Sequence, residues 1–183
     1  MANNSFLLHF VLKQNSFQNR LGNLVAWGTL SLVLITALVV ILRYGFDSGS
    51  IALQESIMYN HALIFMLGIA YTYQQDQHVR VDIFYGRFSE RKKALVNLIG
   101  TLVLTLPVMI YLAYASWDYI VASWQIHEGS ADAGGLGYVF LLKTLILVLV
   151  GLLGLQALSI AAESWLKLQG VQIAHQEHAE GKL

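Results

Sequence analysis

Four long apolar stretches, separated by polar segments, make up most of the chain. Each is close to the roughly 20 residues that an α-helix needs to cross about 30 Å of hydrocarbon. The predicted spans are residues 21–42, 51–73, 94–117 and 138–165. The pattern therefore predicts an all-α integral membrane protein in which residues 21–166 form a bundle of four transmembrane helices.

The four predicted spans are not equally apolar. The first has no charged residue and stops at Arg43. The second carries several polar residues in its first half, namely Gln54, Glu55, Asn60 and His61. The third contains Pro107, and we expect a kink there because proline lacks an amide hydrogen and crowds the carbonyl of Val103.

The residues before and after the four spans are predicted to lie at or beyond the membrane surface. Residues 1–20 carry scattered apolar side chains: Phe6, Leu7, Phe10, Val11 and Phe17. We expect them to form a short amphipathic helix that lies on the membrane surface, as part of a cytoplasmic or interfacial N-terminal segment. Residues 167–183 are mostly polar and are predicted to form a cytoplasmic tail.

Composition narrows the function classes. Of the 183 residues, 56% are hydrophobic and 12% are charged, which lies outside the range of soluble domains. The formal net charge is zero, so there is no bulk attraction to nucleic acid. The chain has no cysteine, which excludes disulfides, thiolate metal sites and cysteine nucleophiles.

Basic residues gather in the connection between the second and third spans. The stretch QHVRVDIFYGRFSERKK, residues 77–93, holds five of the eleven Lys and Arg residues: Arg80, Arg87, Arg91, Lys92 and Lys93. Because basic residues in short loops stay on the cytoplasmic side, both termini are predicted to be cytoplasmic. The arginines are expected to face phospholipid phosphates, although a loop that only fixes topology is the simpler interpretation. The connection 118–138 has no Lys or Arg and is predicted to face outward.

Charged residues near the ends of the spans are candidates for ion pairs, because a lone charge in hydrocarbon is costly. Glu55 is predicted to pair with Lys143 or Arg43 near the outer surface. Arg20 and Glu163 are predicted to pair in the same way near the inner surface. The alternative is that each of these side chains reaches water at the interface.

Small and polar residues mark candidate packing faces, because membrane helices associate through close backbone approach and interhelical hydrogen bonds. The candidates are Gly68 on the second span, Asn97, Thr101 and Thr105 on the third, and Gly151 and Gly154 on the fourth. The three on the third span recur every four residues and so share one face. Each face is compatible with contact inside this chain or with a partner.

His61 is the one histidine inside a predicted span, so it is the candidate haem ligand. Haem between membrane helices generally takes a second histidine at matching depth, and the other histidines fall in loops or tails. A packed histidine is therefore the simpler interpretation of His61. A haem-binding or other membrane-anchor subunit of a redox complex is the alternative function. No serine–histidine, paired-aspartate or zinc-binding helix motif is present, so no enzymatic activity is predicted.

The order of several motifs resembles a known family. These are RYGF at 43–46, FMLGIAYT at 65–72, HVRVDIFYGRFSERKK at 78–93, GGLGYVFLLK at 134–143 and LLGLQAL at 152–158. Together they resemble the small membrane subunit, of DctQ type, of the tripartite ATP-independent periplasmic (TRAP) transporters. The resemblance covers residues 21–166 or so, and the His-Val-Arg-Val-Asp stretch is its most specific part.

The resemblance implies an accessory subunit in the bacterial inner membrane. It implies a large membrane subunit, of M type, that carries the sodium and substrate sites, and a periplasmic substrate-binding protein, of P type. Such transporters take up organic acids and related small solutes with the sodium gradient. This chain would brace the large subunit and help to dock the binding protein, and would hold no cofactor or substrate itself.

Overall fold

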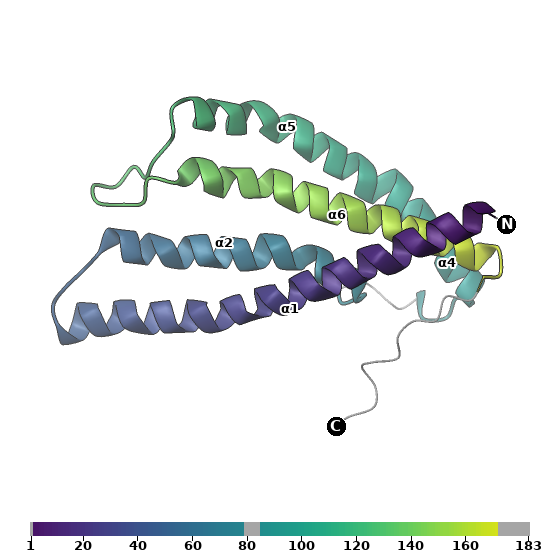
Figure 1. Ribbon diagram of the computed structural model, residues 1–183, viewed down its shortest axis with the longest axis horizontal. Helices are drawn as coiled ribbons and strands as arrows, with labels where there is room; N and C mark the ends of the chain where they lie inside the picture. Colours follow the sequence, from purple (N-terminus) through teal and green to yellow (C-terminus); the bar gives the residue numbers. More distant parts are fainter. Residues whose placement is uncertain (1, 79–84, 172–183) are drawn as a thin grey trace, which may run out of the picture.

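The protein is a bundle of long helices. The computed structural model describes residues 2–78 and 85–171, so Arg80 and most of the predicted tail lie outside the described residues. The helices are α1 (Ala2–Gly45), α2 (Ile51–Gln74), α4 (Glu90–Gly100), α5 (Leu106–Gln125) and α6 (Val139–Leu168). Figure 1 shows them as a bundle, with the α1–α2 and α5–α6 connections at one end and both the N-terminus and α4 at the other end. We call these the loop end and the N-terminal end.

The first helix differs from the prediction. α1 runs for 44 residues without a break, so residues 2–20 continue directly into the first predicted span. The predicted place of this segment at the membrane surface stays a prediction. Val11 and Gln18 are fully buried, and α1 contacts α6 as well as α2. At 1.5 Å per residue the helix is about 66 Å long, which exceeds the 40–45 Å or so of a bilayer. The part of α1 before the first predicted span crosses α6 (Figure 1), where Gln18 donates to the carbonyl of Leu152.

Three helical stretches are long and apolar enough to cross a membrane within the described ranges. They are Asn4–Gly45, Glu90–Gln125 and Val139–Leu168. The all-α membrane character is thus confirmed. α2 has 24 residues, which is long enough to span, but its polar first half keeps it out of this set. The four-span topology stays a prediction.

Just before Pro107, where a kink is predicted, the helix contains a π-helical segment. Residues Thr101–Thr105 join α4 to α5, and the amide of Leu106 donates to the carbonyl of Thr101, five residues earlier. A proline ring crowds the carbonyl four residues before it, and a widened turn relieves that contact without ending the helix. The result is one continuous helical element, residues 90–125, with a change in winding near its middle.

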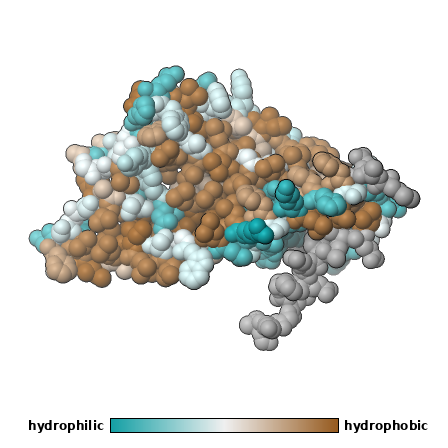
Figure 2. Space-filling view, in the orientation of Figure 1, coloured by the Kyte–Doolittle hydropathy of each residue, from teal (hydrophilic) through white to brown (hydrophobic). Residues whose placement is uncertain are grey.

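Small and polar side chains fill the interior, and large apolar side chains lie outside. The buried residues include Ala70, Ala157, Ala161, Ser116, Ser159 and Ser164. By contrast, Trp27 is 72% exposed and Ile110 is 70% exposed. Figure 2 shows hydrophobic residues over much of the face between the two ends. This distribution suits a protein whose solvent is lipid, because membrane helices gain stability from close contact rather than from burying large apolar groups.

Candidate functional site

Two glycines allow α1 and α2 to lie close together. A side-chain carbon added at Gly22 would lie 2.4 Å from the ring of Tyr71, and one added at Gly28 would lie 2.8 Å from Ile64. Nearby, the side-chain amide of Asn60 donates to the hydroxyl of Ser31 at 2.7 Å. Neither glycine is among the predicted packing positions, although both lie within the first predicted span. Small residues at such crossings are the signal that could have found them.

The glycines predicted to pack on other helices have different surroundings. A carbon added at Gly68 would meet Val25 at 3.7 Å, which is ordinary contact, so Gly68 lies at the α1–α2 interface without requiring its small size. Carbons added at Gly151 or Gly154 would meet no atom within 4 Å beyond their own turn of helix. Neither position is a close helix contact within the described chain, and contact with a partner remains a prediction for both.

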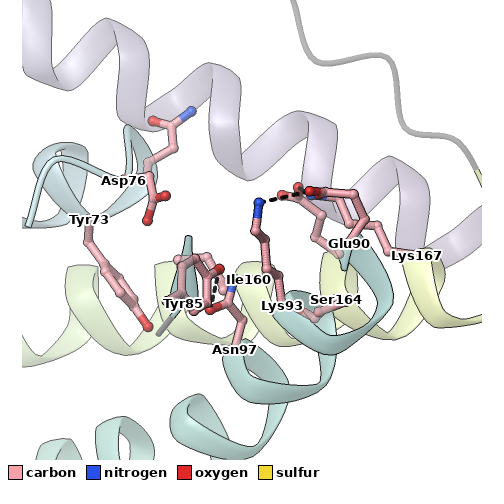
Figure 3. Close-up of a pocket in the computed structure, with 12 residues that line it drawn as sticks. Tyr73, Asp76, Tyr85, Glu90, Lys93, Asn97, Ile160, Ser164 and Lys167 are labelled. Carbon is pink, nitrogen blue, oxygen red and sulfur yellow. Dashed lines mark hydrogen bonds and ion pairs between the residues drawn. The ribbon is translucent and has the colours of Figure 1, made fainter. Parts of the chain in front are cut away.

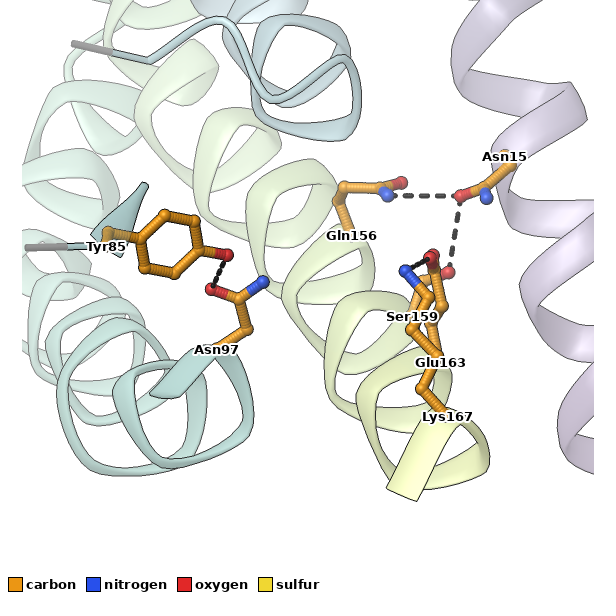
Figure 4. Close-up of polar contacts among 7 residues, drawn as sticks. All are labelled: Asn15, Tyr85, Asn97, Gln156, Ser159, Glu163 and Lys167. Carbon is orange, nitrogen blue, oxygen red and sulfur yellow. Dashed lines mark hydrogen bonds and ion pairs between the residues drawn. The ribbon is translucent and has the colours of Figure 1, made fainter. Parts of the chain in front are cut away.

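Carboxamide side chains of α1 form hydrogen bonds with residues 152–159 of α6. The side-chain oxygen of Asn15 accepts from the amide of Gln156 at 3.2 Å and from the hydroxyl of Ser159 at 3.4 Å (Figure 4). The side chain of Gln18 donates to the carbonyl of Leu152 at 3.4 Å. Asn15 also accepts through its backbone carbonyl from the side chain of Gln74 at 3.1 Å. The N-terminal third of α1 is therefore held by hydrogen bonds to both α2 and α6.

The predicted polar face of the third span points into the bundle near the N-terminal end. Thr101 is 2% exposed, and its hydroxyl lies 3.3 Å from the hydroxyl of Tyr73 on α2. Asn97 accepts a hydrogen bond of 3.1 Å from the hydroxyl of Tyr85. Thr105, one turn further, is half-buried. This face therefore meets α2 and the residues before α4.

A polar cavity of about 270 Å³ opens where the ends of α2, α4 and α6 meet (Figure 3). Its lining includes Tyr73, Asp76, Tyr85, Asn97 and two ion pairs. The Lys93 ammonium lies 2.9 Å from a carboxylate oxygen of Glu90, and the Lys167 ammonium lies 2.8 Å from a carboxylate oxygen of Glu163. The other described basic residues of the predicted cluster, Arg87, Arg91 and Lys92, are exposed. The cavity thus holds paired charges, and the exposed basic groups lie at the start of α4.

Glu163 does not take the partner that the sequence predicts. It pairs with Lys167, one turn along the same helix, and no ion pair joins it to Arg20 within the described residues. Arg20 is exposed on α1. An intrahelical partner four residues away is always within reach, whereas a partner on another helix requires a matching register that the sequence does not reveal.

At the loop end, Glu55 fastens the α5–α6 connection to the first turns of α2. Its carboxylate accepts hydrogen bonds from the hydroxyl of Ser130 and, at 2.6 Å, from the backbone amide of Leu136. Gly135 lies against this contact: an added side-chain carbon would stand 2.5 Å from Ser130 Cβ and 2.7 Å from the Glu55 carboxylate. The predicted pairing of Glu55 with Lys143 or Arg43 is wrong, because loop groups take its place.

Lys143 pairs with Glu128 instead. The Lys143 ammonium donates to the Glu128 carboxylate and lies 3.9 Å from the centre of the Tyr119 ring. The hydrogen bond from Lys143 lowers the pKa of Glu128 below its ordinary value of 4.5. Trp124 adds a second tie between α5 and α6, because its indole donates to the hydroxyl of Thr144 at 2.8 Å. Arg43 is exposed, and no ion pair to it is found in the described part of the chain.

The sequence matches the model of a protein family over most of its length. A family model described as "Tripartite ATP-independent periplasmic transporters, DctQ component" matches residues 32–167. The chain belongs to this family. It is therefore a component of a TRAP transporter, and DctQ components are transporter parts rather than enzymes. No curated protein and no solved structure matches the chain.

The DctQ match covers the contacts at the loop end and the polar cavity. It begins within α1, and it includes the Glu55 and Lys143 contacts at the loop end and the cavity near Lys167. The N-terminal half of α1, which carries Asn15 and Gln18, lies outside the matched residues. The carboxamide contacts of that segment are thus seen in this structure without support from the family match.

Proposed function

We propose that this chain is the accessory subunit of a sodium-coupled TRAP transporter that takes up organic acids or related small solutes. It would brace the large membrane subunit and help to dock the periplasmic binding protein. The observation that carries this proposal is the DctQ family match over residues 32–167. The large subunit would bind the sodium ions and the substrate, and this chain would bind neither.

The bracing role is supported by the way α1 is held. It is 44 residues long, and it contacts both α2 and α6. Hydrogen bonds from Asn60 and Gln156 tie it down at two separate levels. A long helix held along its length is suited to keep a neighbouring subunit at a constant orientation.

The proposed orientation is the one in which both termini face the cytoplasm of a bacterium with this chain in the inner membrane. The start of α4, with Arg91 and Lys92, lies at the same end of the bundle as the N-terminus (Figure 1). The loop end would then face the periplasm. There, Glu55 and Glu128 hold the α5–α6 connection in place, which supports a role in docking the binding protein.

Affinity purification of the tagged chain from native bacterial membranes in mild detergent tests the proposal. The expected result is a large multi-span membrane protein in stoichiometric amount. Reconstituted vesicles that contain both membrane subunits and the binding protein should take up an organic acid only with an inward sodium gradient. Vesicles without this chain are the control. Recovery of the chain alone, or with a redox enzyme and a haem absorption band, would contradict the proposal.

A further inference from the structure

The outward faces of α6 and of the C-terminal third of α1 carry mostly aliphatic side chains. α6 exposes Leu141, Val148, Leu155 and Leu158. The exposed side chains in the C-terminal third of α1 include Val33, Leu34, Leu38 and Ile41. Lipid tails cover such faces without loss of any hydrogen bond, and a partner helix gains little by replacing them.

The outward face of α2 has a different chemistry. Gln54, Met58, His61 and Phe65 are all exposed, and they follow at intervals of four, three and four residues. This spacing places them on one stripe of the helix, which we call the α2 stripe. The ring of His61 stacks on that of Phe65, with centroids 6.5 Å apart. No hydrogen bond from the side chain of Gln54 or His61 is found among the described residues.

Two observations place His61 near the mid-depth of the predicted second span. α2 runs from residue 51 to residue 74, so His61 lies within two residues of its midpoint. The adjacent Asn60 donates to Ser31, which lies midway along the charge-free segment 21–42 of α1. Ionisable side chains at that depth almost always face protein or a water-filled cavity rather than lipid tails.

An apolar hollow continues the α2 stripe toward the N-terminal end. It has a volume of about 560 Å³ and lies between α1 and α2. Its lining includes Phe65 of the stripe and the small residues Gly22, Ala26 and Gly68. Gly22 and Gly68 already lie against α2 and α1 respectively. The stripe therefore offers hydrogen-bonding groups, and the hollow beside it offers room for side chains of a further helix.

We propose that the α2 stripe is the surface on which a membrane helix of the large subunit docks, with His61 hydrogen-bonded to a polar side chain of that helix. This inference rests on the proposed function. Lipid tails have no group that bonds an imidazole at mid-depth, whereas a membrane-spanning partner has. A protein partner on this face also accounts for the polar first half of α2, which keeps α2 out of the set of apolar spans.

Site-specific cross-linking tests the docking surface. The chain has no cysteine, so Met58→Cys and Phe65→Cys each create a single attachment point for a benzophenone maleimide. The matched control is Leu155→Cys on α6, because Leu155 is 44% exposed and Met58 is 52% exposed. In membranes that also contain the large subunit, irradiation should give a covalent adduct with that subunit several-fold more often from α2 than from Leu155.

Each other outcome overturns the docking proposal. Equal or stronger adducts from Leu155 would place the large subunit on α6. Adducts between two copies of this chain would make the stripe a self-association surface. Adducts with lipid alone, from a sample in which the large subunit still co-purifies, would show that lipid covers the stripe.

The substitution His61→Leu tests the hydrogen bond. Loss of one interhelical hydrogen bond should weaken retention of the large subunit about 3- to 30-fold. The isolated chain should keep or gain thermal stability, because leucine is better suited to lipid. Unchanged retention would overturn the proposal. If the unaltered chain itself fails to retain the large subunit, the proposed function fails. If the unaltered chain and His61→Leu retain the large subunit equally well, the docking surface alone fails.

Discussion

The substitution Gly22→Ala should separate α1 from α2 at their closest crossing. The added carbon would lie 2.4, 2.6 and 2.8 Å from three ring atoms of Tyr71. Ordinary contact begins near 3.4 Å, so the ring or the helix must move by about 1 Å. The atoms belong to the base of a rigid ring rather than to a flexible chain end. Such overpacking costs about 1–3 kcal/mol.

The opposing effect is the better helix propensity of alanine, which is worth up to about 1 kcal/mol relative to glycine. Gly154→Ala makes the same chemical change where the added carbon meets no atom within 4 Å, so it measures propensity alone. The difference between the two variants should therefore be about 1–3 kcal/mol of unfolding free energy. The assay is reversible unfolding of the purified chain in mixed micelles of mild detergent and dodecyl sulfate, followed by circular dichroism. Equal stability of the two variants would refute the reasoning, and so would a failure of Tyr71→Leu to relieve Gly22→Ala.

Three further predictions concern the loop end and the orientation. Glu55→Ala removes the acceptor for the Leu136 amide, so that amide should exchange with deuterium faster, and unchanged protection would contradict the contact. The lowered pKa of Glu128 means that its pairing with Lys143 contributes stability above pH 4.5 and loses it as the pH falls through the lowered pKa. Exchange in the loop, corrected for intrinsic rates, should rise over that range, whereas Glu128→Gln should show no such step. Asp132→Cys should react with an impermeant maleimide in intact spheroplasts, whereas Arg91→Cys should react only after lysis. Labelling of Arg91→Cys in intact spheroplasts, with Asp132→Cys protected, would invert the proposed topology.

Much of the helical architecture follows from hydropathy. α2 begins at Ile51, as the pattern predicts, and α6 begins within one residue of the predicted start. Apolar blocks bounded by polar loops define such starts well, because backbone groups in hydrocarbon must be bonded within a helix. The helix Glu90–Gln125 is longer than its predicted span, since a helix continues past the hydrocarbon where nothing in the sequence stops it.

The side-chain partners could not be predicted with equal success. Glu55 is bonded by Ser130 and by a backbone amide in a loop, and loop conformation leaves little trace in a hydropathy pattern. The polar residues of the N-terminal third of α1 looked like a surface segment. Gln18, however, is fully buried, and its side chain donates to the backbone carbonyl of Leu152 on α6. Such matches depend on the register of two helices, which one sequence does not contain.

The widened turn at Thr101–Thr105 bears on how this helix tolerates changes in length. A π-helical turn holds one more residue than an α-helical turn. Deleting one residue inside it would leave regular α-helix while Asn97 and Ser116 kept their present facings toward the bundle. A deletion elsewhere in residues 90–125 would rotate one half against the other by about 100°. The turn is therefore the place where homologous chains can differ by one residue without repacking either half.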